Sequence, residues 1–202
     1  MANFHKYSIP HLLYATYDKS TDIIVEIGSE RGEGSTKFFD SYSKDLEIPF
    51  YSIDIEDNAR TQCTELKNTN WVIASGSVWS KEQLPLLNKK IKVLYLDNFD
   101  WNHNATITNE TGFDKLYEKH GVTWTNLNCV AEHLQQMINC LPYMAEKSII
   151  ICDDTPYQEH SGIYIGKCSA VIPFLILHNY KIVHSGNNGV ILVRGAPNEV
   201  LL

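Results

Sequence analysis

Four aspartates come directly after apolar stretches of the chain, in positions that could bring their carboxylates together. Asp54, Asp97 and the pair Asp153 and Asp154 each end a short apolar run. In open α/β sheets, ligands bind beyond the carboxyl ends of the strands, so we expect these side chains to converge. A carboxylate in this position suits the two hydroxyls of a ribose, which is the role expected for Asp54. The other three would repel one another, and a divalent cation such as Mg²⁺ would relieve that repulsion.

A glycine-rich segment follows the first apolar run and reads Glu-Ile-Gly-Ser-Glu-Arg-Gly-Glu-Gly from Glu26 to Gly34. Glycines at a strand-to-helix turn let a ligand approach the backbone where a side chain would block it. The dinucleotide spacing G-x-G-x-x-G does not fit, because counting from Gly28 places Glu30 and Glu33 at the next two glycine positions. These carboxylates would repel a pyrophosphate and favour a ligand that carries an amine and a sulfonium. A glycine-rich turn without a ligand is the alternative interpretation.

Short apolar runs alternate with segments of helical character along most of the chain. The runs are rich in β-branched and aromatic residues and nearly continuous in apolarity, as strands covered on both faces are. They are Ile23–Ile27, Phe50–Ile53, Trp71–Ala74, Ile91–Leu96 and Ser148–Cys152. The helical segments are Thr36–Lys44, Asn58–Lys67, Lys81–Asn88, Asn126–Met144 and Lys167–His178. This alternation predicts a parallel sheet with right-handed crossovers and helices on both faces.

The C-terminal end of the chain breaks the alternation. Tyr180–His184 and Val190–Val193 have the character of strands, and a Gly/Asn turn from Ser185 to Gly189 joins them. Two strands connected by so short a loop pair antiparallel. We therefore predict an α/β fold, with a Rossmann-like, seven-stranded, mostly parallel sheet that ends in a C-terminal antiparallel hairpin.

The glycine segment resembles the first motif of the class I S-adenosylmethionine (SAM)-dependent methyltransferases, E/D-x-G-x-x-x-G. Residues 26–32 match the motif directly, and sheets of that family finish in the same mixed way. The resemblance spans nearly the whole chain and implies SAM as the cofactor. It implies SAM contacts from Glu26, Gly28, Ser29, Gly32 and Ser35, from Asp54 to the ribose, from Ser77 to the adenine, and from Asp97. Trp79 is expected either to cover the face of the adenine or to be a surface residue that packs on the next helix.

Asp97, Asp153 and Asp154 make the sequence similar to metal-dependent O-methyltransferases of the catechol and macrolide-sugar types. The resemblance implies that these three residues bind Mg²⁺ or a similar divalent cation. Those families carry a Lys or His base three residues after the first Asp, and here that residue is Asp100. Asp100 is our candidate catalytic base, with a further metal ligand or a solvated loop acid as alternatives, and His103 is the nearest substitute base. In the interpretation without metal, one Asp binds SAM and the pair caps a helix.

Composition favours one soluble domain that acts on a small molecule. The net charge is −7 without any run of Lys or Arg, so the clustered cations that bind nucleic acid or an anionic membrane are missing. The five cysteines lack the short spacing of zinc or redox motifs, which favours free thiols in a reducing compartment. No apolar stretch suits a signal peptide or a membrane span, and a cytoplasmic location is expected.

We expect a single SAM-dependent methyltransferase domain over 1–202, with an N-terminal helical lid or cap over 1–20 and an active-site insertion over 99–125. Long loops in a compact domain are usually functional or disordered, and this one is expected to form the acceptor pocket. The expected partner is a small-molecule acceptor that is methylated on a hydroxyl, and a homo-oligomer is left open. The alternatives are metal-independent methyl transfer to nitrogen or carbon, a nucleotide-binding or NAD-dependent Rossmann-type protein, and a SAM-fold protein without catalysis.

Overall fold

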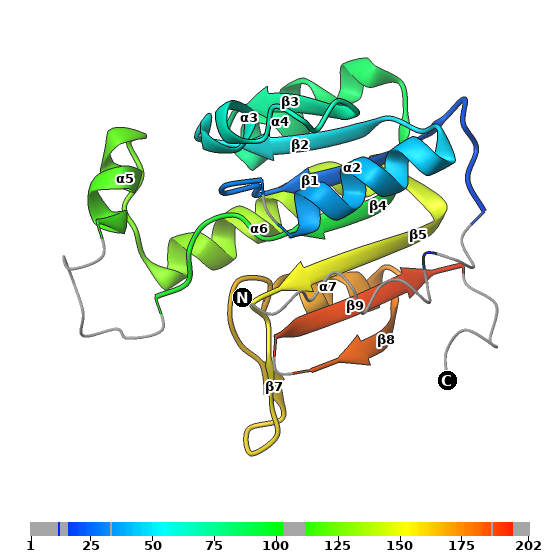
Figure 1. Cartoon of the computed structure of the whole chain (residues 1–202). Coiled ribbons are helices and arrows are strands. Elements are labelled where there is room, and N and C mark those ends of the chain that lie inside the picture. Colours follow the sequence, from blue (N-terminus) through cyan, green and yellow to red (C-terminus); the bar gives the residue numbers. More distant parts are fainter. Residues whose placement is uncertain (1–11, 13–15, 33, 103–111, 187, 196–202) are drawn as a thin grey trace.

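The computed structural model describes residues 12, 16–32, 34–102, 112–186 and 188–195. In this described part, seven strands form one sheet in the order β3-β2-β1-β4-β5-β9-β8 (Figure 1). The strands are β1 (Asp22–Ile27), β2 (Phe50–Asp54), β3 (Thr69–Ile73), β4 (Lys90–Leu96), β5 (Met144–Asp153), β8 (Lys181–Ser185) and β9 (Gly189–Arg194). A separate two-stranded ribbon pairs β6 (Tyr157–Gln158) with β7 (Ile163–Tyr164).

The strand directions agree with the sequence. Neighbouring strands from β3 to β5 run parallel, and β9 pairs antiparallel with both β5 and β8. The predicted mostly parallel sheet with a C-terminal antiparallel hairpin is therefore confirmed. The strand order reverses between β1 and β4, and in such sheets the crevice at the carboxyl ends of these two strands is where ligands bind.

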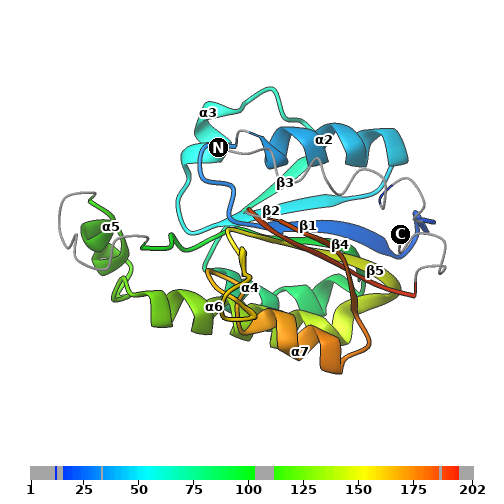
Figure 2. The ribbon, with the colours of Figure 1, turned by 90° about the horizontal axis from the view of Figure 1, so that it is seen from below.

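Helices cover both faces of the sheet, with α2 and α3 on one face and α4, α6 and α7 on the other (Figure 2). The helices are α2 (Ser35–Leu46), α3 (Asn58–Gln62), α4 (Gly76–Glu82), α5 (Phe113–Lys119), α6 (Asn126–Cys140) and α7 (Val171–Leu177). Short 3₁₀ turns, η2 (Leu84–Leu87) and η3 (Leu141–Tyr143), follow α4 and α6. Helix α5 stands away from the sheet on the side of the carboxyl ends of the strands (Figure 1). None of the described helices is long and apolar enough to cross a membrane.

The two faces of the sheet have separate hydrophobic cores, because parallel strands that carry helices on both sides bury both sets of side chains. Strand β4 sends Leu94 into the core that contains Trp79 of α4 and Met137 of α6. It sends Tyr95 into the other core, where Phe39 of α2 packs. All five cysteines are free thiols, as predicted, and all five are buried.

Helix boundaries differ from the predicted ones where proline or glycine interrupts the backbone pattern. Pro142 and Pro85 lie in the 3₁₀ turns η3 and η2, because proline lacks the N–H that an α-helix interior requires. The segment predicted as a helix over Lys167–His178 becomes helical only at Val171. Gly166, just before it, has a φ of +93° and belongs to a turn.

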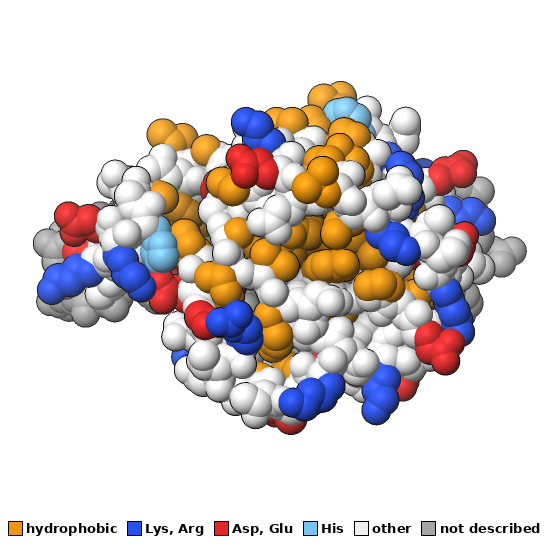
Figure 3. All heavy atoms as spheres, turned by 90° about the horizontal axis from the view of Figure 1, so that it is seen from above, with side chains coloured by type: hydrophobic (Ala, Val, Ile, Leu, Met, Phe, Trp, Pro, Cys, Tyr) orange, Lys and Arg blue, Asp and Glu red, His pale blue; other side chains and the backbone are white. Residues whose placement is uncertain are grey.

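Strand β3 is an edge of the sheet, since it pairs only with β2 among the described strands. Hydrophobic side chains gather near the centre of the face seen from above in Figure 3. Ile73 at the end of β3 is 44% exposed, and Val78 of α4 is 45% exposed. This edge is thus left uncovered, with apolar side chains beside it.

Candidate active site

A cavity of about 930 Å³ opens at the carboxyl ends of β1, β2, β4 and β5, and α5 and α6 supply part of its wall. Ligand pockets commonly measure roughly 300–1,000 Å³, so this one has room for a cofactor and a second small molecule. Three residues of its wall, Glu30, Phe99 and Asp154, have φ angles of 48°, 56° and 46°. Residues other than glycine rarely adopt this backbone conformation, and such backbone strain is often found at functional sites.

The two glycines of the predicted motif are needed for different reasons. Gly28 has a φ of +103°, and a Cβ atom there would lie 2.3 Å from the main-chain nitrogen of Asn98. Gly28 therefore lets the ends of β1 and β4 approach each other on the cavity wall. A Cβ atom on Gly32 would lie 2.8 Å from the sulfur of Cys63. Gly32 does not line the cavity. A glycine is needed there because the backbone packs closely against Cys63 at the end of α3.

Asp54, at the end of β2, holds the glycine segment in place. Its Oδ2 accepts hydrogen bonds from the main-chain N–H groups of Ser29 at 2.8 Å and Glu30 at 2.9 Å. Its Oδ1 accepts the main-chain N–H of Glu56 at 3.0 Å. A carboxylate has about four lone-pair sites, so Oδ1 keeps one for a ligand. Asp54 and Ser29 both line the cavity, where the sequence placed them.

Glu26, predicted to bind the polar end of SAM, lies beneath the cavity wall and not on it. The residue is fully buried, and its Oε2 accepts hydrogen bonds from Thr36 at 2.8 Å and Ser52 at 2.7 Å. Burial raises the pKa of this carboxyl to about 7. Glu26 thus joins β1, β2 and α2, while Ser35, at the start of α2, does line the cavity.

The wall after β3 differs in detail from the sequence expectation. Ser77 does not line the cavity, and its main-chain N–H donates to Oε1 of Glu132 at 3.0 Å. Ser75 and Glu132 line the cavity instead. Trp79 is 1% exposed and packs with its ring centroid 6.2 Å from that of Tyr51. It is therefore a core residue, which corrects the expectation of a surface position for it.

Lys167 lies between two of the three predicted metal ligands. Its Nζ is 2.8 Å from Oδ1 of Asp97, 3.1 Å from the carbonyl oxygen of Asp97, and 3.1 Å from Oδ2 of Asp154. Burial alone would lower the pKa of Lys167, but the carboxylates of Asp97 and Asp154 raise it well above its ordinary value. Burial raises the pKa of Asp97, and the ammonium of Lys167 opposes that rise. Nζ thus contacts two carboxylates and one carbonyl oxygen of the wall.

The third predicted metal ligand, Asp153, is turned to other partners. Its Oδ2 accepts a hydrogen bond from the hydroxyl of Tyr95, and its Oδ1 accepts the main-chain N–H of Asp154 at 2.9 Å. No group of three or more His, Cys, Asp or Glu side chains in the described part of the chain is placed to hold a metal ion. An ammonium group thus contacts two of the three predicted metal ligands, Asp97 and Asp154, and binding of a metal by the three aspartates stays a prediction.

Asp100, the candidate base, lies on the cavity wall after β4. The hydroxyl of Tyr117 donates to its Oδ2 at 3.1 Å and accepts its main-chain N–H at 2.8 Å. The indole N–H of Trp124 donates to its carbonyl oxygen at 2.9 Å, and the ring of Phe99 stacks on that of Tyr117 at 4.3 Å. These contacts fold α5 and its flanks over the end of β4 and fix the carboxylate of Asp100.

The described residues of the predicted insertion over 99–125 thus supply part of the cavity wall. Its remaining residues, including the alternative base His103, lie outside the described part of the chain, as does most of the predicted lid over 1–20. Whether 1–20 forms a lid stays a prediction.

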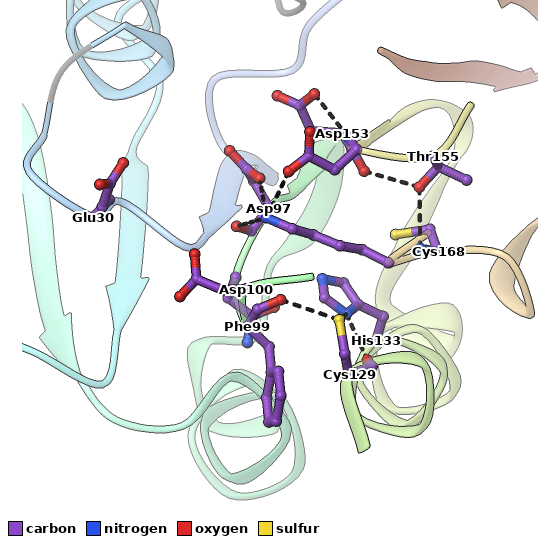
Figure 4. A network of polar contacts seen from close by, with 12 residues as sticks. Glu30, Asp97, Phe99, Asp100, Cys129, His133, Asp153, Thr155 and Cys168 are labelled. Carbon is purple, nitrogen blue, oxygen red and sulfur yellow. Dashed lines mark hydrogen bonds and ion pairs between the residues drawn. The ribbon is translucent and has the colours of Figure 1, made fainter. Parts of the chain in front are cut away.

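A neutral histidine lies beside this group of charges. Figure 4 shows His133 of α6 close to Cys129 and Phe99, below the aspartates. One ring nitrogen, Nδ1, lies 2.8 Å from the carbonyl oxygen of Cys129, and burial lowers the pKa of His133 to about 3. The imidazole therefore adds no positive charge next to Lys167.

The fold of the chain is similar to that of solved structures at low sequence identity. No model of a known protein family matches the chain, and no curated protein sequence is similar to it. The structure of SMU.1697c from Streptococcus mutans, in complex with S-adenosylhomocysteine (SAH), is similar with a TM-score of 0.53 and 11% identity over 96% of this chain and 98% of that one. The structure of the N-methyltransferase NodS from Bradyrhizobium japonicum WM9, also with SAH, is similar with a TM-score of 0.52 and 11% identity, over 95% of this chain and 87% of that one. The structure of a variant of LepI, with SAH and a substrate analogue, is similar with a TM-score of 0.58 and 10% identity, over 96% of this chain and 48% of that one.

These similarities lie in the arrangement of the sheet and its helices. Together with the strand order and the antiparallel C-terminal hairpin, they show that the chain has the fold of the class I SAM-dependent methyltransferases.

Proposed function

We propose that this protein transfers the methyl group of SAM to a small-molecule acceptor. The observation that carries the proposal is the position of the cavity, at the carboxyl ends of β1 and β4, where the strand order reverses. The glycine turn after β1 and Asp54 after β2 both line this cavity. Gly28 lines this cavity, and its lack of a Cβ atom lets β1 and β4 come together at the wall. The three similar structures are complexes with SAH, the product that SAM leaves after it gives up its methyl group.

The three parts of SAM fit three stretches of the wall. In our assignment the methionine part lies along the main chain of Gly28 and Ser29 and reaches Ser35. The ribose lies at the free lone pair of Asp54 Oδ1. The adenine lies next to Ser75, where Glu132 closes the wall.

The rest of the cavity, around Phe99, Asp100 and Tyr117, is left for the acceptor. We assign a hydroxyl as the accepting group and Asp100 as its base. The hydroxyl oxygen bonds to the methyl carbon as the carbon–sulfur bond breaks. The sulfur keeps that electron pair and leaves as SAH, and the hydroxyl proton passes to the carboxylate of Asp100. Holding the two reactants in line supplies much of the rate.

Transfer to nitrogen is a second candidate, favoured by the charge of the cavity wall. Glu30, Asp100 and Asp154 bring carboxylates to the cavity wall, against the ammonium of Lys167. Negative charge stabilises the positive charge that an amine acquires as it accepts a methyl group. The carboxylate of Asp100 would then take the amine proton.

Calorimetric titration with SAH tests the proposal without knowledge of the acceptor. Saturable binding of SAH, with no binding of NAD or ATP, is expected. Asp54→Asn loses charge-assisted hydrogen bonds to the glycine segment and should weaken SAH binding about 10-fold or more. Asp57→Asn is the matched control, because Asp57 pairs with Arg60 and does not line the cavity, and it should bind SAH like the wild type. Binding of NAD in place of SAH would refute the proposal.

A further inference from the structure

Lys167 has the contacts of a built-in cation. An ammonium group has three donors, and the oxygens around Nζ are three: the carbonyl and Oδ1 of Asp97, and Oδ2 of Asp154. The side chain of Lys167 is only 6% exposed, although it lines the cavity. The ammonium group is therefore held at the wall by protein oxygens and is largely shielded from solvent.

The backbone around Lys167 is shaped to bring it there. A Cβ atom on Gly166 would lie 1.9 Å from the carbonyl oxygen of Asp154, so only glycine lets the two segments pass this closely. The main-chain N–H of Lys167 donates to that same carbonyl at 3.2 Å. The next N–H, of Cys168, donates to Oγ1 of Thr155 at 3.0 Å. The segment after β7 is thus joined to the segment after β5 at consecutive residues.

We propose that the ammonium of Lys167 is the permanent cation of this active site, in the position for which the sequence predicts Mg²⁺, and that the protein binds SAM and transfers methyl groups without a divalent metal. The ammonium neutralises one of the two carboxylates it touches and ties the ends of β4 and β5 together. A divalent cation would have to displace Nζ from all three oxygens to bind there.

This arrangement also restricts the acceptor, a consequence that rests on the proposed function. A metal ion would bind the acceptor oxygen directly and lower its pKa. The donors of Nζ are already occupied, so Lys167 cannot replace that step. The acceptor must therefore give its proton to a carboxylate such as Asp100 or Asp154, and the site suits hydroxyls or amines that need a proton acceptor and no Lewis acid.

Binding of Mn²⁺ alone, followed by electron paramagnetic resonance after treatment with a chelator, tests the permanent cation. The wild type should show no saturable site for Mn²⁺, with or without SAH. Lys167→Ala leaves the oxygens of Asp97 and Asp154 without a cation and should gain a saturable Mn²⁺ site. Lys181→Ala is the matched control, because Lys181 is exposed on β8, and it should gain none.

Two further arms keep the result interpretable. Lys167→Arg keeps the positive charge and, like the wild type, should bind no Mn²⁺. SAH affinity of the wild type should be unchanged by the chelator. A saturable Mn²⁺ site in the wild type that Asp154→Asn abolishes would overturn the inference, as would a folded Lys167→Ala protein that gains no Mn²⁺ site. Failure of SAH to bind would instead refute the proposed function, so the two ideas fail separately.

Discussion

The main chain of Gly28 lies so close to that of Asn98 that a Cβ atom on the glycine would be 2.3 Å from the asparagine nitrogen. Hydrogen bonds between the neighbouring main-chain groups explain this close approach. The N–H of Gly28 donates to the carbonyl of Ile53 at 2.8 Å, and the N–H of Asp97 donates to the carbonyl of Ile27 at 2.9 Å. The sheet pairing therefore continues up to the rim of the cavity, and only glycine allows it.

Gly28→Ala should lower the free energy of unfolding by about 3 kcal/mol, because it adds a strained φ and an overpacked contact. Urea unfolding measures this change. Gly121→Ala is the matched control, since Gly121 also has a positive φ, +71°, but a Cβ atom there would meet no atom within 4 Å. It should cost only about 1–2 kcal/mol. Equal losses in the two variants would contradict the close approach described for Gly28.

Glu26 should make stability depend on pH near neutrality. Burial raises the pKa of its carboxyl from 4.5 to about 7, so the folded protein holds this proton more tightly than the unfolded chain does. The resulting stabilisation is complete below the unfolded pKa and is lost as the pH rises through about 7. Relative to Glu26→Gln, the wild type should lose about 3 kcal/mol between about pH 4 and about pH 8.5. Urea unfolding at both pH values tests this, and a constant difference between the two proteins would contradict it.

Asp100→Asn should lower kcat by about 100-fold or more, since a positioned base contributes on that scale. SAH affinity should not change, because we assign Asp100 to the acceptor side of the cavity. Methyl transfer to an identified acceptor, followed by mass spectrometry, gives the rate. Glu118→Gln, on the adjacent helix α5 but not on the cavity wall, should keep the wild-type kcat. An unchanged kcat in Asp100→Asn would remove it from the role of base.

Glu56 should hold α5 against the end of β2. Its Oε1 lies 2.9 Å from Nζ of Lys119 and also contacts the ring of His120, and these hydrogen bonds, with Lys119 first, lower the pKa of Glu56. Glu56→Gln should speed hydrogen exchange in α5 while leaving that of α6 unchanged. Equal protection of α5 in both proteins would show that other contacts hold this helix.

The parts of the site that follow strands could be predicted from the sequence. An apolar run with a carboxylate after it marks both a strand and the edge at which it ends, and Asp54, Asp97 and Asp100 do lie on the cavity wall. Gly28 followed from the same pattern. Glu26 belongs to the motif but lies beneath the cavity wall. Its side chain is fully buried, where it accepts a hydrogen bond from Ser52 of β2.

The parts that reach the cavity from elsewhere could not be predicted. Glu132 comes from the middle of α6, 55 residues after its partner Ser77, and its helical spacing says nothing about that contact. The sequence pattern assigns Lys167 to a helix, and the missed signal is the glycine before it, which marks a turn and a close approach. The aspartates indicated a cation at this point of the wall, and the ammonium of Lys167 contacts two of them, which the sequence pattern did not show.

The structure of the complex with SAH tests the central claim most directly. The account predicts SAH in the cavity, with a ribose hydroxyl at Oδ1 of Asp54, its adenine beside Ser75, and its sulfur facing the side of Asp100. SAH bound at another surface, or a cavity that stays empty at saturating SAH, would contradict it.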